Sequence, residues 1–282
     1  MSTANGLRAS IVVIGDEILG GFVQDANSGW LAGRLQAHGV PLDRVVTVPD
    51  EVDAIDEALT GELARSRPRL VVTSGGLGST PDDRTMQAVA HLLGVGLTVE
   101  PTIDARISAA LERNAAYGTT ASAEHDRSVR RMALVPESSY LLGDRGFAPG
   151  VAVDVDGGSR AGGATIVILP GIPDEFRRIA RDCVEPELLA GRGRPQHVIE
   201  ITHPYPESAL NPVLEQLEAD YPDVHVGSYP GRRCTVRLKG PREQVEGAAA
   251  RVREALAAVE AAPGSDRLRA TWQAHWPADE PA

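Results

Sequence analysis

Runs of apolar residues alternate with amphipathic segments along roughly the first two thirds of the chain. Residues 9–14, 44–48 and 70–73 are dominated by apolar and β-branched residues, which is typical of strands buried on both faces. Between the second and third runs, apolar residues recur at helical spacing at Val52, Ile55, Leu59 and Leu63. Strands that alternate with helices in this way predict a mostly parallel sheet covered on both faces, and hence an α/β fold.

Helix signals fill the segments between these strands. Asp25 or Asn27 is expected to cap the first helix, Asp50 the second, and Thr80 followed by Pro81 is expected to open the third. Further helices are predicted over 103–114, 124–132 and 174–189, and two paired strands over 151–155 and 165–169.

A polar stretch rich in helix breakers, Gly191–Pro195, is the best candidate for a domain linker. The pattern after it predicts a strand, a helix, two strands and a helix, over 197–202, 208–219, 224–228, 232–238 and 242–258. We therefore predict a first domain over 1–190, a small βαββα domain over 196–260 and a C-terminal tail over 261–282. The tail is expected to fray, although three of its apolar residues could form a stripe: Leu268, Trp272 and Trp276.

Composition narrows the classes of function. The chain carries 28 Lys+Arg against 39 Asp+Glu, a formal net charge of −11, which disfavours a nucleic-acid partner. No stretch approaches the ~18 apolar residues of a membrane span, and the first apolar run is too short for a signal peptide. The two cysteines, Cys183 and Cys234, make neither a disulfide framework nor a thiolate zinc site, so a cytoplasmic location is expected.

The strongest candidate for chemistry is the glycine-rich segment that follows the third strand. It contains Ser74, Gly75, Gly76, Gly78, Ser79 and Thr80. Backbone N–H groups of such a loop favour an anion, typically a phosphate, at the sheet edge where ligands bind in open α/β folds. A plain strand-to-helix turn is the alternative. The loop is not a P-loop, because no Lys follows, nor a nicotinamide fingerprint, because Pro81 stands where the third glycine belongs.

Two acidic pairs flank this loop in the predicted fold. Asp82 and Asp83 either complement the dipole of the predicted third helix, worth about 0.3–1 kcal/mol each, or hold a divalent cation that bridges to a phosphate. Asp16 and Glu17 follow the first strand and are either solvated loop acids or part of the same polar site.

Two further positions lie near this predicted edge. Asn27 is either a helix-start residue or a ligand contact. Gly171, between two prolines, permits close approach of a ligand or of another loop, and a structural turn is the favoured interpretation there.

These motifs together resemble a known family. Gly15–Leu19, the Asp25-x-Asn27-Ser28 step, Ser74–Thr85 and Leu169–Pro173 occur in the order and spacing of the MoaB/Mog-like molybdopterin-binding domain of the competence/damage-inducible protein A (CinA) family. The resemblance runs from about residue 9 to about residue 258. Ser74 and Ser79 depart from it, because the family more often has Thr and Pro there, and so does the loop Leu142–Gly146.

The resemblance implies a three-layer α/β domain with a mostly parallel sheet, followed by the smaller α/β domain. It implies a small phosphorylated ligand, molybdopterin or a nucleotide, and a divalent metal, Mg²⁺ or a transition metal. It also implies a homo-oligomer, with no nucleic-acid or membrane partner expected. The C-terminal amidase domain of full-length CinA is expected to be absent.

Our first hypothesis is a metal-dependent nucleotide pyrophosphatase that acts on an ADP-ribose-like substrate. Four carboxylates are assigned to catalysis, and the last two of them also to the metal: Asp16, Glu17, Asp82 and Asp83. Eight residues are assigned to ligand binding: Asn27, Ser74, Gly75, Gly76, Gly78, Ser79, Thr80 and Gly171. The alternative hypothesis is a non-catalytic or molybdopterin-handling binding module of molybdenum cofactor metabolism that uses the same pocket.

Overall fold

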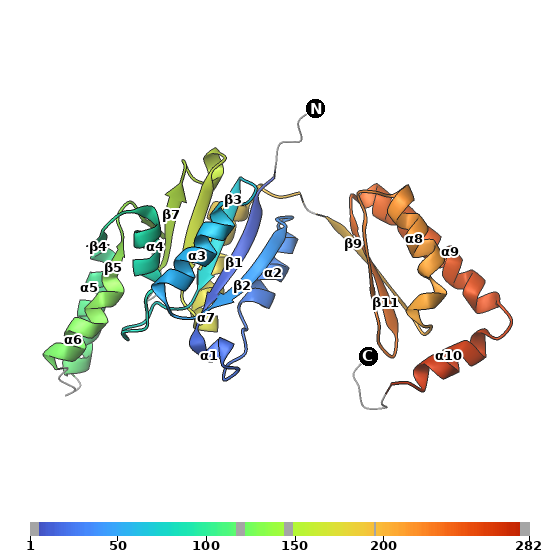
Figure 1. Cartoon of the computed structure of the whole chain (residues 1–282), viewed down its shortest axis with the longest axis horizontal. Helices are drawn as coiled ribbons and strands as arrows, with labels where there is room; N and C mark the ends of the chain where they lie inside the picture. The colour runs from blue at the N-terminus through green and yellow to red at the C-terminus, as the bar shows by residue number, and fades with distance from the viewer. Residues whose placement is uncertain (1–5, 117–121, 144–148, 195, 277–282) are drawn as a thin grey trace. The chain divides into compact units, whose positions relative to one another are not determined.

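The computed structural model describes residues 6–116, 122–143, 149–194 and 196–276. The chain forms two compact units, residues 1–195 and residues 196–282 (Figure 1). Each unit has its own hydrophobic core.

A six-stranded sheet forms the centre of the first unit, in the order β2-β1-β3-β8-β7-β6. Its strands are β1 (Arg8–Ile14), β2 (Leu42–Val48), β3 (Arg69–Ser74), β6 (Tyr140–Leu142), β7 (Gly150–Val155) and β8 (Ala164–Leu169). The first four strands in the sheet order are parallel, and β7 and β6 continue the sheet in antiparallel pairs. The predicted mostly parallel sheet is confirmed, as is the pairing of β7 with β8.

Helices cover both faces of this sheet, because successive side chains of a strand point to opposite sides. On one face, α2 (Ser28–Ala37) and α7 (Pro173–Ile179) contribute Leu31 and Phe176 to a core with Ile11 of β1. On the other face, α3 (Val52–Leu63) and α4 (Thr85–Leu93) contribute Ile55 and Val89. The result is the three-layer arrangement visible in Figure 1.

Beyond α4, the chain adds a small subdomain that the sequence pattern predicted only in part. It consists of α5 (Pro101–Ala116), α6 (Ala123–Arg130), the 3₁₀ turn η1 (Arg131–Ala133) and a two-stranded sheet of β4 (Leu97–Val99) and β5 (Leu134–Pro136). The short helix α1 (Asp16–Leu19) was also not predicted. The predicted helix over 174–189 changes at residue 180 into a π-helical segment, Ala180–Leu189, that contains Pro186.

Two predicted helix starts are wrong. The N-cap of α3 is Glu51 and not Asp50, whose carboxylate accepts a hydrogen bond from the backbone of Asp16 instead. The helix α4 begins at Thr85 and not at Pro81.

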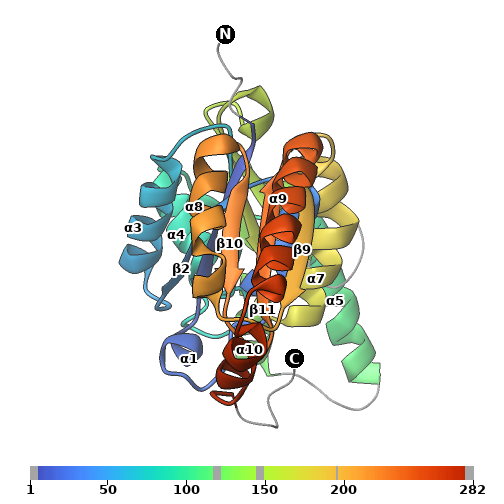
Figure 2. The ribbon, with the colours of Figure 1, turned by 90° about the vertical axis from the view of Figure 1, so that its right-hand side faces the viewer.

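The second unit is a three-stranded antiparallel sheet, in the order β10-β11-β9, covered on one face by helices. Its main elements are β9 (His197–His203), α8 (Asn211–Asp220), β10 (His225–Tyr229), β11 (Cys234–Gly240) and α9 (Arg242–Ala261). Figure 2 shows α8 and α9 side by side over the strands. Part of the tail expected to fray forms the helix α10 (Ser265–Gln273), where the Trp272 indole donates to the Gly231 carbonyl at 3.1 Å.

The residues before the second unit are attached to the first. The N–H of Arg194 donates to the carbonyl of Gly39 at 3.1 Å, and a Cβ at Gly193 would lie 2.2 Å from the carbonyl oxygen of His38. The linker candidate therefore packs against the end of α2 as far as residue 194, and Pro195 lies outside the described residues.

Candidate functional site

The glycine-rich loop after β3 is held between the ends of two neighbouring strands. The N–H of Gly75 donates to the carbonyl of Leu169 at the end of β8. A Cβ at Gly75 would lie 2.1 Å from the carbonyl oxygen of Ile14, at the end of β1. Gly75 and Gly76 also have φ angles of +112° and +66°, which side chains disfavour. Both glycines are therefore needed for the loop to fit between the strands.

Thr85 fixes the other end of the loop. Its hydroxyl donates to the carbonyl of Gly75 at 2.8 Å, and its N–H donates to the carbonyl of Gly76 at 3.2 Å. The side chain is fully buried. These contacts place the first turn of α4 directly on the glycine loop, which explains why the helix begins at this residue.

The residues between the loop and α4 form a separate turn. The carboxylate of Asp83 accepts hydrogen bonds from the N–H and the hydroxyl of Thr80, and hydrogen bonding with Thr80 lowers the pKa of the exposed Asp82. Both acids precede α4, whose first turn contains no acidic residue. The helix-dipole interpretation of Asp82 and Asp83 is therefore wrong.

Asn27 joins three loops of the site. Its side-chain N–H group donates to the hydroxyl of Ser74 at 2.9 Å and to the carbonyl of Gly171 at 2.8 Å. Its side-chain oxygen is buried and has no hydrogen-bond partner among the residues described. Asn27 precedes α2 without capping it through its side chain, so its contacts favour a role in assembling the site.

A cavity opens beside the glycine loop, and its lining is acidic. We call it the acidic cavity; its lining comprises Ile14, Glu17, Asp50, Gly75, Gly76, Leu77, Gly78, Asp82, Asp83, Met132, Pro170, Gly171, Ile172 and Glu175. Five of these residues carry carboxylates and none carries a basic side chain. The structure thus brings together Glu17, Asp82 and Asp83 with the three predicted loop glycines and Gly171, from loops far apart in the sequence.

Asp50 is the residue of this cavity that sequence reasoning misinterpreted. Burial raises its pKa, and the negative charges of Glu17, Asp16 and Asp82 raise it further. The N–H of Asp16 donates to its carboxylate at 2.9 Å, so Asp16 is joined to the cavity through Asp50. The signal was present in the sequence, because Asp50 follows β2 as Asp16 follows β1.

Four predicted ligand-binding residues lie outside the lining of the acidic cavity: Asn27, Ser74, Ser79 and Thr80. The Ser74 hydroxyl accepts a hydrogen bond from the Asn27 side chain, and the N–H of Thr80 donates to the Asp83 carboxylate. The carbonyl of Ser79 accepts hydrogen bonds from Ser128 and Arg131, on the side of the loop that faces η1.

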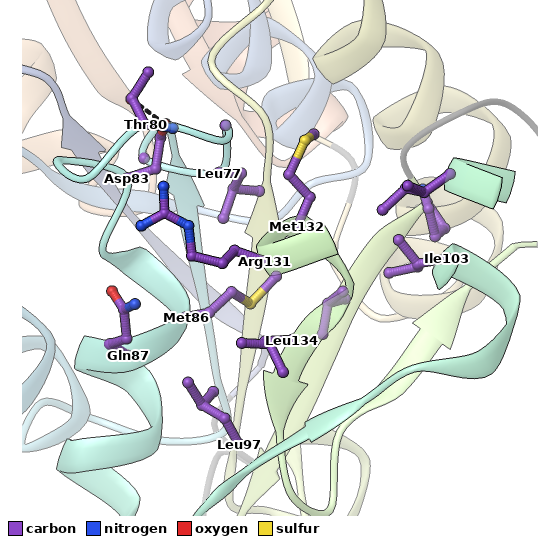
Figure 3. A pocket seen from close by; sticks show the side chains of 15 residues that line it. Leu77, Thr80, Asp83, Met86, Gln87, Leu97, Ile103, Arg131, Met132 and Leu134 are labelled. Atoms are coloured by element: carbon purple, nitrogen blue, oxygen red, sulfur yellow. Dashed lines mark hydrogen bonds between the residues drawn. The ribbon is translucent and has the colours of Figure 1, made fainter. Parts of the chain in front are cut away.

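A second cavity adjoins the first across the glycine loop (Figure 3). The two cavities share Gly76, Leu77, Gly78, Asp83 and Met132. In the part of the chain that is described, no three His, Cys, Asp or Glu side chains are grouped so that they could hold a metal ion. None of the described helices has the length and apolar character needed to cross a membrane.

The comparison with protein families agrees with this geometry. A family model for a probable molybdopterin binding domain matches residues 10–190. The chain belongs to this family. The match covers the first unit with its glycine loop and its acidic cavity, and it confirms the resemblance found in the sequence.

Individual relatives show the CinA likeness. A CinA-like protein of Mycobacterium sp. (strain MCS) is 37% identical over 218 residues, which are 76% of this chain and 50% of that protein. A protein of Aeropyrum pernix is 35% identical over 227 residues, 79% of each chain. The crystal structure of CinA from Thermoplasma acidophilum, described as having unknown function, matches with a TM-score of 0.52 and 30% identity, over 64% of this chain and 96% of that one. The matched region spans about half the length of the mycobacterial relatives.

Proposed function

We propose that this chain binds a phosphorylated pterin or nucleotide at the glycine loop and hydrolyses a nucleotide pyrophosphate such as ADP-ribose with a divalent cation. The family description supports a pterin-type ligand. The hydrolase activity rests on the residues of the acidic cavity, as follows.

The observation that carries the proposal is the charge of the acidic cavity. Five carboxylates and no basic side chain line it. Two like charges 4 Å apart repel each other by about 4 kcal/mol at an effective dielectric constant of 20. A phosphate that approaches the glycine loop from this side therefore needs a cation between itself and the acids.

The side chains present fit a hard divalent cation. Glu17 and Asp82 offer carboxylate oxygens, which Mg²⁺ prefers. Burial raises the pKa of the neighbouring Asp50, and the negative charges of Glu17, Asp16 and Asp82 raise it further. Mg²⁺ is commonly held by one or two carboxylates together with substrate phosphates, so a preformed cage of three side chains is not required. When bound, such an ion supplies positive charge that polarises the phosphoryl group and lowers the pKa of water.

The loop amides supply the second part of the site. Within the described residues, the N–H groups of Gly76, Leu77 and Gly78 donate to no other group. Uncommitted N–H groups in consecutive residues favour a phosphate oxygen. They would hold a phosphate group of the pyrophosphate beside the carboxylates of the cavity.

Asp50 is the best candidate for the general base of the reaction. It lines the acidic cavity, and burial together with neighbouring negative charges raises its pKa, which makes its carboxylate a stronger proton acceptor than that of an ordinary aspartate. Water attacks one phosphorus, its proton passes to the Asp50 carboxylate, and the bond from that phosphorus to the bridging oxygen breaks. The products are AMP and ribose 5-phosphate.

The experiment is incubation of the purified chain with ADP-ribose and Mg²⁺ or Mn²⁺, with chromatography of the products, beside a matched reaction in chelator. We expect AMP only with metal, and its loss in Asp82→Asn. The matched control is Asp53→Asn, which removes an exposed acid of α3 that does not line the cavity. Equal ligand binding with and without metal, and no turnover, would overturn the hydrolase proposal in favour of the binding module.

A further inference from the structure

A further cavity lies at the end of the sheet opposite to the glycine loop. We call it the arginine cavity; its volume is about 410 Å³ and its lining comprises Arg8, Asp43, Ala64, Arg65, Ser66 and Arg69. Its residues from the sheet stand at the starts of β1, β2 and β3, which run parallel and reach the acidic cavity only at their other ends. The arginine cavity is therefore separate from the site described above.

Positive charge dominates this cavity, although the chain as a whole has a formal net charge of −11. Three arginines and one aspartate line it. The aspartate, Asp43, is already shared by two of these arginines, because its carboxylate accepts hydrogen bonds from Arg8 at 3.0 Å and from Arg69 at 2.6 Å. The lining thus carries two more positive charges than negative ones.

A buried acid of α3 does not remove this surplus. Glu62 is fully buried and forms ion pairs with two arginines of the lining, Arg65 at 3.6 Å and Arg69 at 3.9 Å. It also pairs at 3.5 Å with Arg44, which does not line the cavity. Glu62 and Arg44 add one charge of each sign, so the surplus of two positive charges remains.

Two arginines of the lining keep unused donors. Arg8 binds Asp43 through Nε and Nη2, and its Nη1 has no hydrogen-bond partner among the described residues. Arg65 approaches Glu62 only through Nε, at 3.6 Å, which is too long for a hydrogen bond. Within the described chain both of its terminal nitrogens are therefore uncommitted. The two side chains are 41% and 40% exposed, so an ion can reach them from solvent.

The buried Arg69 fixes the wall of the cavity. Its side chain is 1% exposed, and its Nε donates to the carbonyl of Ser66 at 3.0 Å while its terminal nitrogens bind Ser10 and Asp43. Among the residues that the structure describes, the N–H and the hydroxyl of Ser66 donate to no group. Ser66 therefore offers two neutral donors beside the free guanidinium nitrogens.

This set of donors and charges favours a phosphate over other anions. The planar fork of an arginine matches the spacing of phosphate and carboxylate oxygens. A phosphate group carries close to two negative charges at pH 7, which matches the surplus, whereas a carboxylate would leave one positive charge uncompensated. A nucleic acid is disfavoured by the net charge of the chain, so the phosphate belongs to a small molecule.

We propose that the arginine cavity binds a small phosphate dianion, either inorganic phosphate or the phosphate group of a phosphomonoester, between the guanidinium groups of Arg8 and Arg65 and the N–H of Ser66. The site does not depend on the proposed function, because its lining shares no residue with the acidic cavity. It gives the chain a second phosphate site, at which arginines take the place of a metal ion.

The experiment is calorimetric titration of the full chain with inorganic phosphate and, separately, with glycerol 2-phosphate, at low ionic strength and in chelator. The chelator removes the cation that a phosphate in the acidic cavity requires. We expect saturable binding of one equivalent of at least one of the two compounds. Tighter binding of glycerol 2-phosphate identifies a phosphomonoester as the ligand, and tighter binding of inorganic phosphate identifies the free ion.

Three variants and a matched control locate the site. Arg65→Gln and Arg8→Gln should each weaken phosphate binding by about tenfold or more, since each loses charge-assisted hydrogen bonds. Arg65→Lys should fall between Arg65→Gln and the wild-type chain, because it keeps the charge but loses the fork. The control is Arg44→Gln, which removes the same charge from the same network outside the cavity and should change the affinity by less than about threefold.

The same titrations can overturn the inference. A wild-type chain that binds neither compound would do so, as would Arg65→Gln and Arg8→Gln variants that bind phosphate as the wild-type chain does. An equal loss in Arg65→Gln and Arg44→Gln would also overturn it, because the affinity would then depend on net charge and not on the cavity. Thermal melting shows that each variant is folded, and the exposed position of Arg65 favours a folded variant.

Discussion

The carboxylate of Asp50 accepts a hydrogen bond from the backbone N–H of Asp16 at 2.9 Å, which ties the loop after β2 to the loop after β1. The two residues are neighbours because β1 and β2 are parallel and end at the same sheet edge. Burial raises the pKa of Asp50, and the negative charges of Glu17, Asp16 and Asp82 raise it further. Asp50 is thus both a structural link and an acid of the cavity whose pKa is raised.

The first prediction concerns the charge of Asp50. Asp50→Asn keeps an oxygen that can accept from Asp16 but removes the negative charge. We expect Mg²⁺-dependent binding of ADP-ribose to weaken by about tenfold or more, as for other residues that support a metal site. In chelator, binding should be equal or tighter, because one repulsive charge is gone. Calorimetric titration of the wild-type chain and of Asp50→Asn, with and without Mg²⁺, measures this, with Asp53→Asn as the control.

The sign of the stability effect is opposite to that of the binding effect. Burial and nearby negative charges raise the pKa of Asp50 in the folded state, so the folded chain binds its proton more tightly than the unfolded chain does. The free energy of unfolding therefore falls as the pH rises through the folded-state pKa. Asp50→Asn should therefore stabilise the ligand-free chain at neutral pH, as measured by urea unfolding. A variant less stable than the wild-type chain would show that the hydrogen bond from Asp16, and not the charge, dominates at this position.

The second prediction separates two glycines of the loop. Gly75→Ala places a Cβ 2.1 Å from the Ile14 carbonyl at a φ of +112°, so the backbone must move. At a site with compatible backbone angles, Gly→Ala stabilises a protein by up to about 1 kcal/mol. Here the backbone is incompatible, so we expect the free energy of unfolding to fall by more than about 1 kcal/mol. At Gly78 the nearest atom to a new Cβ is a carboxylate oxygen of Asp83, 2.6 Å away, which is the end of a side chain.

Gly78→Ala should accordingly cost little stability but displace Asp83 from Thr80. The expected result is a near-normal urea midpoint with weaker Mg²⁺-dependent binding of ADP-ribose. Thr80→Val, which removes the hydroxyl that Asp83 contacts, should reproduce the binding loss. If Gly78→Ala binds as the wild-type chain does, Asp83 has no part in the site.

The sequence predicted the sheet and the glycine loop well, for a physical reason. Strands covered on both faces must be apolar at consecutive positions. The sequences of β1 and β3 therefore predict buried strands without knowledge of the strands they pair with. The loop could be predicted because its positive φ angles between β3 and α4 require glycines, which stand out in the sequence. The family motifs added the acids after β1 and before α4.

The sequence pattern did not predict the start of α4 or the second cavity beside the glycine loop. Thr80-Pro81 has the local signature of a helix start, and only tertiary contacts of Thr85 with the loop move the start to Thr85. The lining of this second cavity includes residues of α4, α5, β5 and β7, and these elements are far apart in the sequence. Periodicity reports which residues are buried but not which of them face one another.

The third prediction concerns a buried ion network at the opposite end of the sheet. Arg69 is almost fully buried, and donates to the Asp43 carboxylate and the Ser10 hydroxyl, both at 2.6 Å. Arg69→Met leaves Asp43 and the buried Glu62 without this charge and should cost about 3 kcal/mol or more. Arg44→Met removes an exposed partner of Glu62 and should cost under about 1 kcal/mol. Equal losses in urea unfolding would contradict the assigned burial of the network.

This network also predicts a dependence on pH. Burial alone would raise the pKa of Asp43, but hydrogen bonds from Arg8 and Arg69 outweigh it and leave the pKa lowered. A lowered acid pKa stabilises the folded chain above the ordinary Asp value, about 3.9, and this stabilisation is lost as the pH falls below it. Arg69→Met should reduce that loss between pH 5 and pH 3.

The last prediction concerns His203 in the second unit. Its side chain is only 2% exposed at the end of β9, and burial lowers its pKa from 6.5, opposed in part by the backbone of Tyr205. A neutral buried histidine must be protonated on unfolding in acid, so stability is present above pH 6.5 and falls as the pH drops toward the pKa of the folded state. His203→Leu should remove this dependence, and His225→Leu, at an exposed site on β10, should leave it unchanged.

The measurement must distinguish the two units of the chain, and its three tryptophans allow this. Trp30 lies on α2 in the first unit, whereas Trp272 and Trp276 belong to the second. Urea titrations followed by the indole NMR signals at pH 7.5 and pH 5.5 give a midpoint for each unit. We expect the midpoint from Trp272 to fall at pH 5.5 in the wild-type chain and in His225→Leu, but not in His203→Leu. If the midpoint falls equally in all three, His203 is not the group whose protonation weakens this unit.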